Sequence, residues 1–405
     1  MHLLTDVEMP VAKILAEMEV AGIRVDAQVL KDQGKLINAR IDELEKAIYA
    51  GAGEEFNISS PKQLGVILFE KLHLPVIKKT KTGYSTAADV LEQLMTEHEI
   101  IPYITEYRQL TKLDSTYIKG LVPMIAEDGK IHTIYKQAQT QTGRLSSIEP
   151  NLQNIPIRLD EGRLIRKAFI PDNTDNLLVA SDYSQIELRV LAELANVDEL
   201  IQAFKLDRDI HRETATKIFD VSSEAVTDLM RSQAKTVNFG IIYGMSDFGL
   251  ASQLGIHRQA AKQFIEKYFE LFPGVRDYMN RTISAAEEKG YVETVLSRRR
   301  YFPTIHSRNF NERNFAKRAA MNAPIQGSAA DILKLAMIKI DTALKAKKLK
   351  TKMLLQVHDE LIFDVPKDEI AEVKELIIYE MTHAYQMNVP LQVSVAEGES
   401  WHEAK

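Results

Sequence analysis

Residues 177–189 read Leu177-Leu178-Val179-Ala180-Ser181-Asp182-Tyr183-Ser184-Gln185-Ile186-Glu187-Leu188-Arg189. The run 177–180 is compact and apolar, which is typical of a buried strand, and a helical pattern begins at Ile186. Asp182 therefore stands at the end of a buried strand, where a carboxylate is held rigidly yet open to solvent. Such a carboxylate suits a hard divalent cation such as Mg²⁺. Acids at strand ends are also common surface residues, so this stretch alone favours neither interpretation.

A second acidic segment lies near the end of the chain. The apolar runs 353–357 and 361–365 flank His358-Asp359-Glu360, which predicts a hairpin with acids at its tip. If Asp182 and Asp359 meet across a sheet, they could hold two ions roughly 4 Å apart, with phosphates and water as the other ligands. Taken alone, Asp359 is more typical of a turn residue than of a metal ligand.

Arg231, Lys235, Phe239 and Tyr243 are each four residues from the last and would form a stripe along one face of a helix. The two cations come first and could hold a triphosphate, while the two aromatics offer flat surface to a sugar and base. An ordinary amphipathic helix with a basic start explains the spacing equally well. Glycines at 240 and 244 favour function, because glycine in a helix usually marks close backbone approach or a helix end.

Arg318, Asn322 and Gln326 would share another helical face, and their donors suit the acceptors that every base pair offers in the minor groove. The net charge of -6 excludes a uniformly basic coat, so nucleic-acid binding must come from local patches. The segment 298–318 is one, being rich in Arg and Lys with interleaved aromatics. A shorter cluster comprises Lys78, Lys79 and Lys81, and alone it is more typical of a solvated face.

The composition is that of a globular protein of several domains. The 405 residues are 45% hydrophobic and 27% charged, and they include no cysteine. The absence of cysteine excludes disulfides and thiolate metal sites. No apolar run is long enough to span a bilayer. The N-terminus carries charges where a secretory signal would be apolar. We expect a cytoplasmic protein with no membrane partner.

The pattern of elements changes along the chain. Residues up to about 128 indicate long helices, such as 30–49, with a helix start at Ser60-Pro61 and an irregular basic loop at 78–85. Short strands follow from about 129, including 131–137, and a mostly helical region runs from 186 to about 345. The strand-rich segments are thus separated by a long helical insertion, which predicts a central sheet that is discontinuous in sequence.

At this point the motifs resemble those of bacterial family A DNA polymerases, the DNA polymerase I type. The resemblance rests on 182–189, 231–244, 321–331 and 357–360, with further matches at 60–64, 142–147 and 151–156. These motifs occur in the family's order and at its spacing, and they cover essentially the whole chain.

The resemblance implies an α+β multi-domain chain with the right-hand polymerase fold, in which an antiparallel-sheet palm carries helical fingers and a helical thumb. The implied division is a linker at 1–24, the thumb at 25–128, the palm at 129–188 and 326–405, and the fingers at 189–325. The Asp6-Val7-Glu8 triplet mimics an exonuclease signature, but no nuclease domain precedes it in this sequence. We therefore interpret it as linker and expect no proofreading.

The resemblance also assigns roles to single residues. The implied metal ligands are Asp182, Asp359 and the backbone carbonyl of Tyr183, with Glu360 supporting catalysis nearby. The implied nucleotide site contains Arg231, Lys235, His211, Phe239, Tyr243, Gln185 and Glu187. In it Lys235 would also donate a proton to pyrophosphate, and Glu187 would exclude a 2′-hydroxyl. The implied DNA contacts are Arg144, Asn151, Asn154, Arg318, Asn322, Gln326 and His358, together with the thumb lysines Lys78, Lys79 and Lys81.

The implied activity is template-directed addition of deoxynucleotides to a primer 3′-hydroxyl, with release of pyrophosphate. The implied cofactors are two Mg²⁺ ions, with Mn²⁺ as a substitute, and the partners are primer-template DNA and deoxynucleoside triphosphates. By the same resemblance we expect a monomer in the bacterial cytoplasm, associated with the nucleoid. Two alternatives stay open: a single-subunit RNA polymerase, against which Glu187 argues, and an inactive DNA-binding protein on the same fold.

Overall fold

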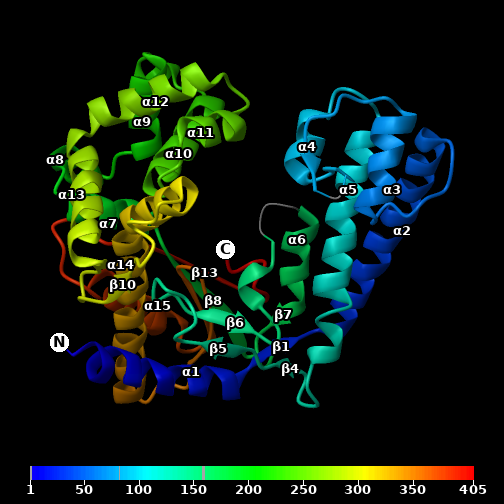
Figure 1. Ribbon diagram of the computed structural model, residues 1–405. Coiled ribbons are helices and arrows are strands. Elements are labelled where there is room, and N and C mark those ends of the chain that lie inside the picture. The colour runs from blue at the N-terminus through cyan, green and yellow to red at the C-terminus, as the bar shows by residue number, and fades with distance from the viewer. Residues whose placement is uncertain (1, 82, 157–159) are drawn as a thin grey trace.

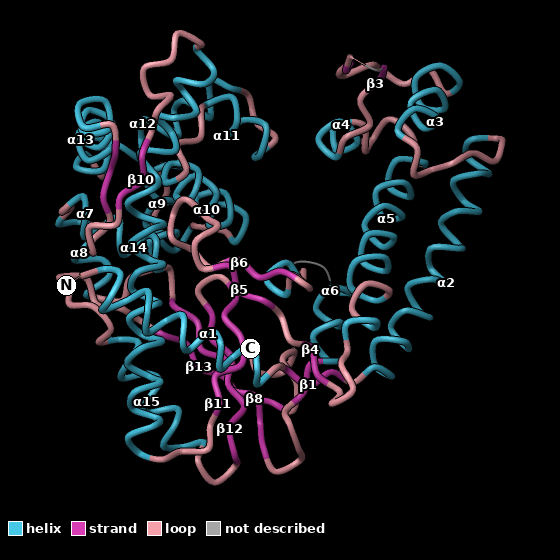
Figure 2. The backbone as a smooth tube through the Cα atoms, turned by 60° about the horizontal axis from the view of Figure 1, so that its bottom comes forward, coloured by secondary structure: helices cyan, strands magenta, loops and turns pink. Residues whose placement is uncertain are grey.

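The computed structural model describes residues 2–81, 83–156 and 160–405. Two helical lobes rise from a common base, and the base holds the main sheet (Figure 1). Seen with the base brought forward, most of the strands gather between and below the lobes (Figure 2). Thr82, part of the expected basic loop, lies outside the described residues.

The main sheet has the order β11-β12-β8-β13, formed by β11 (Lys352–Val357), β12 (Glu360–Pro366), β8 (Asn176–Tyr183) and β13 (Val393–Gly398). Every neighbouring pair is antiparallel. Along β8, Val179 belongs to one hydrophobic core while Leu178 and Ala180 belong to another. Both faces of the sheet are therefore covered, which explains the uninterrupted apolar run. The predicted discontinuous sheet and the hairpin 353–365 are confirmed.

The first lobe is built on the packed helices α2 (Ala27–Ala52) and α5 (Ile100–Leu113). Its far end carries α3 (Pro61–Val66), α4 (Ala88–Gln93), β2 (Lys79–Thr80) and β3 (Gly83–Tyr84). The predicted helix start at 60–61 is confirmed, because the Ser60 hydroxyl accepts a hydrogen bond from the backbone N–H of Gln63. The expected irregular loop instead forms a small hairpin in which Lys79 pairs with Tyr84.

The second lobe is helical, as expected. It contains α7 (Ile186–Ala195), α8 (Asp198–Lys205), α9 (Ile210–Phe219), α10 (Asp228–Ile242), α11 (Asp247–Leu254), α12 (Arg258–Leu271) and α13 (Pro273–Lys289). A hairpin of β9 (Tyr291–Glu293) and β10 (Arg299–Tyr301), which the sequence did not predict, interrupts the helices. The long α14 (Phe310–Lys347) then runs from this lobe down into the base (Figure 1).

Short strands join the first lobe to the base. β1 (Ile23–Val25) lies between β4 (Lys130–Ile131) and β7 (Phe169–Ile170), while β5 (Ile134–Lys136) pairs with β6 (Ser146–Ile148). The single strand expected at 131–137 is thus divided, because its two halves pair with different partners. Two further helices are α6 (Asp160–Ile165), which packs against α2, and α15 (Ile370–Thr382), which packs against α14 and β13.

Seven short helical turns complete the described chain. Their bounds are Leu3–Glu8, Ile67–Lys71, Asp114–Ile118, Val122–Met124, Leu152–Asn154, Arg166–Ala168 and Ser223–Ala225. In the ranges that the structure describes, no helix combines the length and the apolar character needed to cross a membrane.

The N-terminal segment differs from the linker that the sequence suggested. α1 (Met9–Ala21) packs along α14 and β11, and Val7 is fully buried. Glu8 pairs with the buried Lys334 and the partly buried Arg298. The Asp6-Val7-Glu8 triplet therefore belongs to the packed base.

Candidate functional site

The two acidic segments lie side by side at one end of the main sheet. Asp182 near the end of β8 is in register with Glu360 at the start of β12, and the Tyr183 N–H donates to the backbone carbonyl of Asp359 at 3.3 Å. The expectation that these distant segments meet is confirmed. The meeting follows from the antiparallel pairing of β8 with β12, which sequence patterns do not specify.

Both aspartates are harder to ionise than free carboxyls. The pKa of Asp182 rises to about 6, mainly because surrounding protein atoms displace water from one side of a residue that is otherwise exposed, and further through the negative charge of Glu360. The pKa of Asp359 also rises to about 6; burial is the main cause, Arg144 opposes it, and Glu187 and Asp182 add repulsion. A bound cation would relieve this repulsion, so the donor chemistry fits a hard divalent ion.

No third acid completes a metal cage. Within the described ranges, no group of three or more His, Cys, Asp or Glu side chains has the geometry of a metal site. Glu360 turns instead into the protein, where one oxygen accepts from Trp401 Nε1 at 3.4 Å and the other lies 3.8 Å from Arg166. Asp182 and Asp359 thus remain as the carboxylates of these two segments that could hold ions taking their other ligands from a substrate.

Glu187 lies at the start of α7 and joins three parts of the chain. Its side chain is buried, with one oxygen 2.5 Å from Arg144 Nη2 and the other accepting from the Tyr243 hydroxyl at 2.7 Å. Arg144 also lies 4.0 Å from Asp359. The sequence did not predict these contacts of Arg144, because they depend on how the loop before β6 packs over α7.

The stripe predicted along α10 lies on one helix, with Tyr243 as the residue that ends it. Arg231 donates from Nε to Asp209 at 2.6 Å, and Lys235 is exposed. Phe239 packs against the ring of His211, with centroids 5.9 Å apart. Arg231, at the cationic start of the stripe, is therefore paired with Asp209. Tyr243, at its aromatic end, lies beside Glu187.

His211 is only 2% exposed, and its pKa falls to about 4, mainly through burial, so the ring is neutral at pH 7. Its Nδ1 faces the Asn238 amide at 2.8 Å. With Nδ1 as acceptor, Nε2 carries the proton, and the ring can offer one neutral donor. Gln185, also expected at this site, is half-buried and adopts a left-handed φ of 54° just before α7.

Several expected DNA-contacting residues line one hollow of about 550 Å³ between the base and α14. These are Arg144, Asn151, Asn154, Gln326 and His358. A second hollow of about 730 Å³ shares Asn151, Asn154 and His358 and continues to residues of α5 on the first lobe. The two hollows together make a path from α14 toward the first lobe, here called the polar path for its Arg, Asn, Gln and His side chains, although apolar residues such as Leu113, Leu121 and Ile155 also line the second hollow.

The other expected DNA contacts lie elsewhere. Arg318 is exposed on α14, whereas Asn322 is 9% exposed and donates to the carbonyl of Ile242 at 3.4 Å. Lys78, Lys79 and Lys81 are exposed in and beside the β2–β3 hairpin, which lies at the far end of the first lobe (Figure 2).

The structure adds residues that the sequence did not single out. Gln153 donates to Gln356 Oε1 at 2.9 Å, and the Gln356 amide donates to the carbonyl of His358 at 2.5 Å. These two hydrogen bonds support the turn that presents Asp359. Gln153 lies inside the motif 151–156, so the motif was visible although the contact was not.

The comparisons place these features among known proteins. Residues 27–403 match the model of DNA polymerase family A. The chain is 57% identical over 405 residues to DNA polymerase I of Lactococcus lactis and 57% identical over 406 residues to that of Bacillus subtilis. Each match covers 100% of this chain and 46% of the relative, so the chain spans about half the length of these curated relatives.

A solved structure gives the same picture of the fold. The POL domain of Pol1 from M. smegmatis, in complex with DNA primer-template and dNTP, matches with a TM-score of 0.95 and 46% identity. The match covers 99% of this chain and 71% of that one. The two-lobed architecture is therefore the right-hand polymerase fold.

Proposed function

Because this chain belongs to DNA polymerase family A, we propose that it extends a DNA primer along a template strand, using deoxynucleoside triphosphates and releasing pyrophosphate. The observation that carries the proposal is the pair Asp182 and Asp359 at one end of the sheet, both with a raised pKa of about 6. Two such carboxyls are disfavoured unless a cation binds between them.

Family A polymerases in general use divalent metal ions. We assign Asp182, Asp359 and the backbone carbonyl of Tyr183 as the ligands of two Mg²⁺ ions, for which Mn²⁺ can substitute. When bound, such ions lower the pKa of an attacking hydroxyl and neutralise charge on phosphates. Glu360 would support Asp182 from within the sheet while remaining engaged with Trp401.

The chain's own cations would bind and orient the incoming triphosphate. Arg231 and Lys235 lie on one face of α10, and Arg231 would exchange its partner Asp209 for a phosphate. Lys235, exposed on the same helix, would donate a proton to the leaving pyrophosphate. The neutral His211 would donate one hydrogen bond from Nε2, and the in-line geometry would supply much of the rate.

Selection of the sugar would depend on Glu187. Arg144 and Tyr243 hold both of its carboxylate oxygens, so the side chain cannot move aside easily. A 2′-hydroxyl would clash with this fixed carboxylate, because the side chain cannot move away and both of its oxygens already accept hydrogen bonds from other donors. Phe239 and Tyr243 would then border the base, and Gln185 the sugar and phosphates.

The duplex would follow the polar path between the base and the first lobe. Arg144, Asn151, Asn154, Gln326 and His358 line it. Arg318 and Asn322 would join them along α14, and the latter would have to leave its contact with Ile242. Lys78, Lys79 and Lys81 would contact phosphates further along the duplex.

A primer-extension assay with Mg²⁺ tests the proposal. Asp182→Asn and Asp359→Asn should each lower the extension rate at least about 1,000-fold, because a neutral amide is a poor ligand for a hard cation. DNA binding, measured by fluorescence anisotropy, should change less than threefold. Asp364→Asn is the control, since Asp364 lies on the same hairpin and pairs with Leu178 further along β8. Extension by either of the first two variants at the normal rate would refute the metal assignment.

The same assay separates the alternatives. A single-subunit RNA polymerase would prefer ribonucleotides on the primed template, and an inactive DNA-binding protein would bind the duplex without extending it. The bacterial cytoplasm is the proposed location, because the relatives are bacterial. The monomeric state and the domain borders stay predictions.

A further inference from the structure

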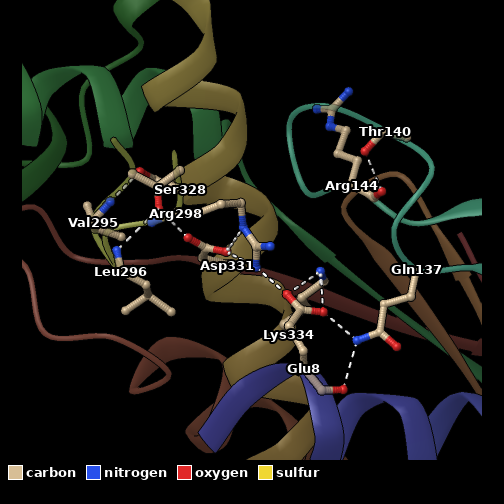
Figure 3. A network of polar contacts seen from close by, with 11 residues as sticks. Glu8, Gln137, Thr140, Arg144, Val295, Leu296, Arg298, Ser328, Asp331 and Lys334 are labelled. Carbon is tan, nitrogen blue, oxygen red and sulfur yellow. Dashed lines mark hydrogen bonds and ion pairs between the residues drawn. The ribbon is translucent and has the colours of Figure 1, made fainter. Parts of the chain in front are cut away.

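Four charged side chains form a cluster between the N-terminal segment, the β9–β10 hairpin and α14. This four-charge cluster consists of Glu8, Arg298, Asp331 and Lys334 (Figure 3). Lys334 Nζ lies 2.9 Å from Glu8 Oε1, and Arg298 donates from Nε to Asp331 Oδ1 at 2.8 Å. Arg298 also pairs with Glu8 and thereby joins the two halves.

The cluster is internally neutral and shielded from water. It has two anions and two cations, and Asp331 and Lys334 are almost fully buried. Removing one member would leave an uncompensated buried charge, which is strongly destabilising. The remaining carboxylate oxygens accept from neutral groups: Thr294 donates to Asp331, and Gln137 donates to Glu8. The position of Arg298 is therefore set from several directions at once.

The loop Thr140–Arg144, here the arginine loop, rests directly on Arg298. A Cβ added to Gly143 would lie 2.6 Å from Arg298 Nε, and this glycine has a φ of 83°. On the other side, a Cβ added to Gly327 of α14 would lie 3.0 Å from the carbonyl of Thr142. The loop is also closed on itself, because the Thr140 hydroxyl donates to the carbonyl of Arg144 at 2.6 Å.

The arginine loop ends in the residue that contacts the proposed active site. Arg144 pairs with Glu187 at 2.5 Å and approaches Asp359 to 4.0 Å. A displacement of Arg298 would move Gly143, and Arg144 is the next residue. A misplacement of about 1 Å in a positioning group can lower a rate by about 100-fold.

We infer that Glu8 is a positioning residue for the active site, acting through Arg298 and the arginine loop on Arg144. This role of Glu8 rests on the proposed function, because Arg144 contacts the proposed nucleotide-transfer site. Glu8 contacts no residue that the proposed function assigns to substrate, ion or DNA; Arg298, from the basic segment 298–318, is engaged inside the cluster. The effect of Glu8 would pass mainly through the packing of Gly143 on the Arg298 guanidinium. Gln137, which donates to Glu8 three residues before the arginine loop, holds the same loop from its start.

A double-mutant cycle on primer extension tests this path. Glu8→Gln should lower kcat about 10- to 100-fold in the otherwise unchanged protein, and less than twofold in an Arg144→Ala background. Glu17→Gln is the matched control. Glu17 also joins α1 to α14, through Lys345 at 2.7 Å, but belongs to an exposed pair. It should leave kcat within about twofold of normal.

The outcomes are distinguishable. If Glu8 were merely structural, Glu8→Gln would lower the melting temperature and would lower kcat by the same factor in both backgrounds, which would overturn the inference. Should Glu8→Gln fail to fold, Gly143→Ala perturbs the same contact from the loop side and should show the same dependence on Arg144. Normal kcat in a folded Gly143→Ala protein would equally overturn it. Absence of extension by the unchanged protein would instead reject the proposed function.

Discussion

Glu187 shows how one side chain can be held by the site that it serves. The carboxylate is 4% exposed, and both of its oxygens are engaged, one by Arg144 and one by Tyr243. Beside this carboxylate the pKa of the Tyr243 hydroxyl rises, mainly through burial, so the phenol stays a donor. A carboxylate held at both ends is a rigid obstacle, which is what discrimination between similar sugars requires.

Glu187→Ala should therefore raise the ratio of ribonucleotide to deoxynucleotide incorporation. We expect an increase of about 10- to 1,000-fold, equivalent to about 1.4–4 kcal/mol of lost discrimination. Competition of the two nucleotides on one primed template measures the ratio. Tyr243→Phe is the control, because it removes one hydrogen bond to Glu187 but leaves the carboxylate in place. It should change the ratio much less, and equal effects of both variants would contradict the assignment.

The two raised pKa values predict how pH and Mg²⁺ act together. In the metal-free protein the pKa of Asp182 and of Asp359 is about 6, above the ordinary value of 3.8. Between pH 3.8 and pH 6 the folded state therefore binds more protons than the unfolded state at these two carboxyls. Their contribution to stability is thus present below about pH 4 and is lost as pH rises through 6. At pH 8 both carboxylates are ionised, and Mg²⁺ at ten times its Kd should add about 1.4 kcal/mol.

Calorimetric melting with and without Mg²⁺ checks this expectation. The ion should raise the melting temperature at pH 8 and have little effect at pH 5, where protons occupy the two carboxyls. Asp359→Asn should remove most of the effect at pH 8. A Mg²⁺ effect of the same size at both pH values would show that the ion binds elsewhere.

The contact between α10 and α14 depends on a glycine at the end of α10. Gly244 has a φ of 64°, and a Cβ there would lie 2.7 Å from Met321 Cε and 3.0 Å from Arg318 Cγ. The glycine thus ends the helix that carries Arg231 and Lys235, and it lets that helix approach α14 closely. The two reasons for glycine, backbone conformation and space, can be separated by experiment.

Gly255 offers the matched comparison, since its φ is also 64° but nothing lies within 4 Å of an added Cβ. Gly255→Ala should destabilise the protein by about 1 kcal/mol through the backbone alone. Gly244→Ala should cost about 1–3 kcal/mol more through overpacking, and should raise the KM for the incoming nucleotide. Urea unfolding and steady-state kinetics measure both. Equal losses in the two variants would show that the close approach is unimportant.

Charge is unevenly distributed over the molecule as a whole. The net charge is -6, yet the far end of the first lobe exposes Lys78, Lys79 and Lys81. Lys78 is 3.6 Å from Asp89, a separation at which an exposed pair contributes little. A duplex that follows the polar path from α14 toward the first lobe would bring phosphates to this end (Figure 1).

Replacing Lys78, Lys79 and Lys81 together with Gln should weaken DNA binding and reduce its salt dependence. Each lost phosphate contact lowers the magnitude of the slope of log K against log salt by about 0.9, so a change of about 1–3 is expected. Anisotropy titrations over a range of salt concentrations measure the slope. Lys347→Gln, in a surface pair with Glu372, is the control and should leave the slope unchanged. An unchanged slope in the triple variant would remove these lysines from the DNA surface.

Much of this molecule could be predicted from local patterns. The strand before Asp182, the hairpin around Asp359 and the α10 stripe were recognisable because burial and hydrogen bonding impose periods of two and of 3.6 residues on a sequence. Motif order then indicated the family. The hairpin at 291–301 was missed, because its strands of three residues are too short to show a period.

Other features arise from packing between segments that are remote in sequence. Nothing local to Glu8 indicates Lys334 or Arg298 as its partners, and nothing local to Arg144 indicates Glu187. The same holds for the raised pKa of Asp359, whose main cause is burial by the assembled fold. Side-chain type and spacing are properties of a short stretch of chain. Burial, charge balance and the position of a functional group depend on which distant segments the fold brings together.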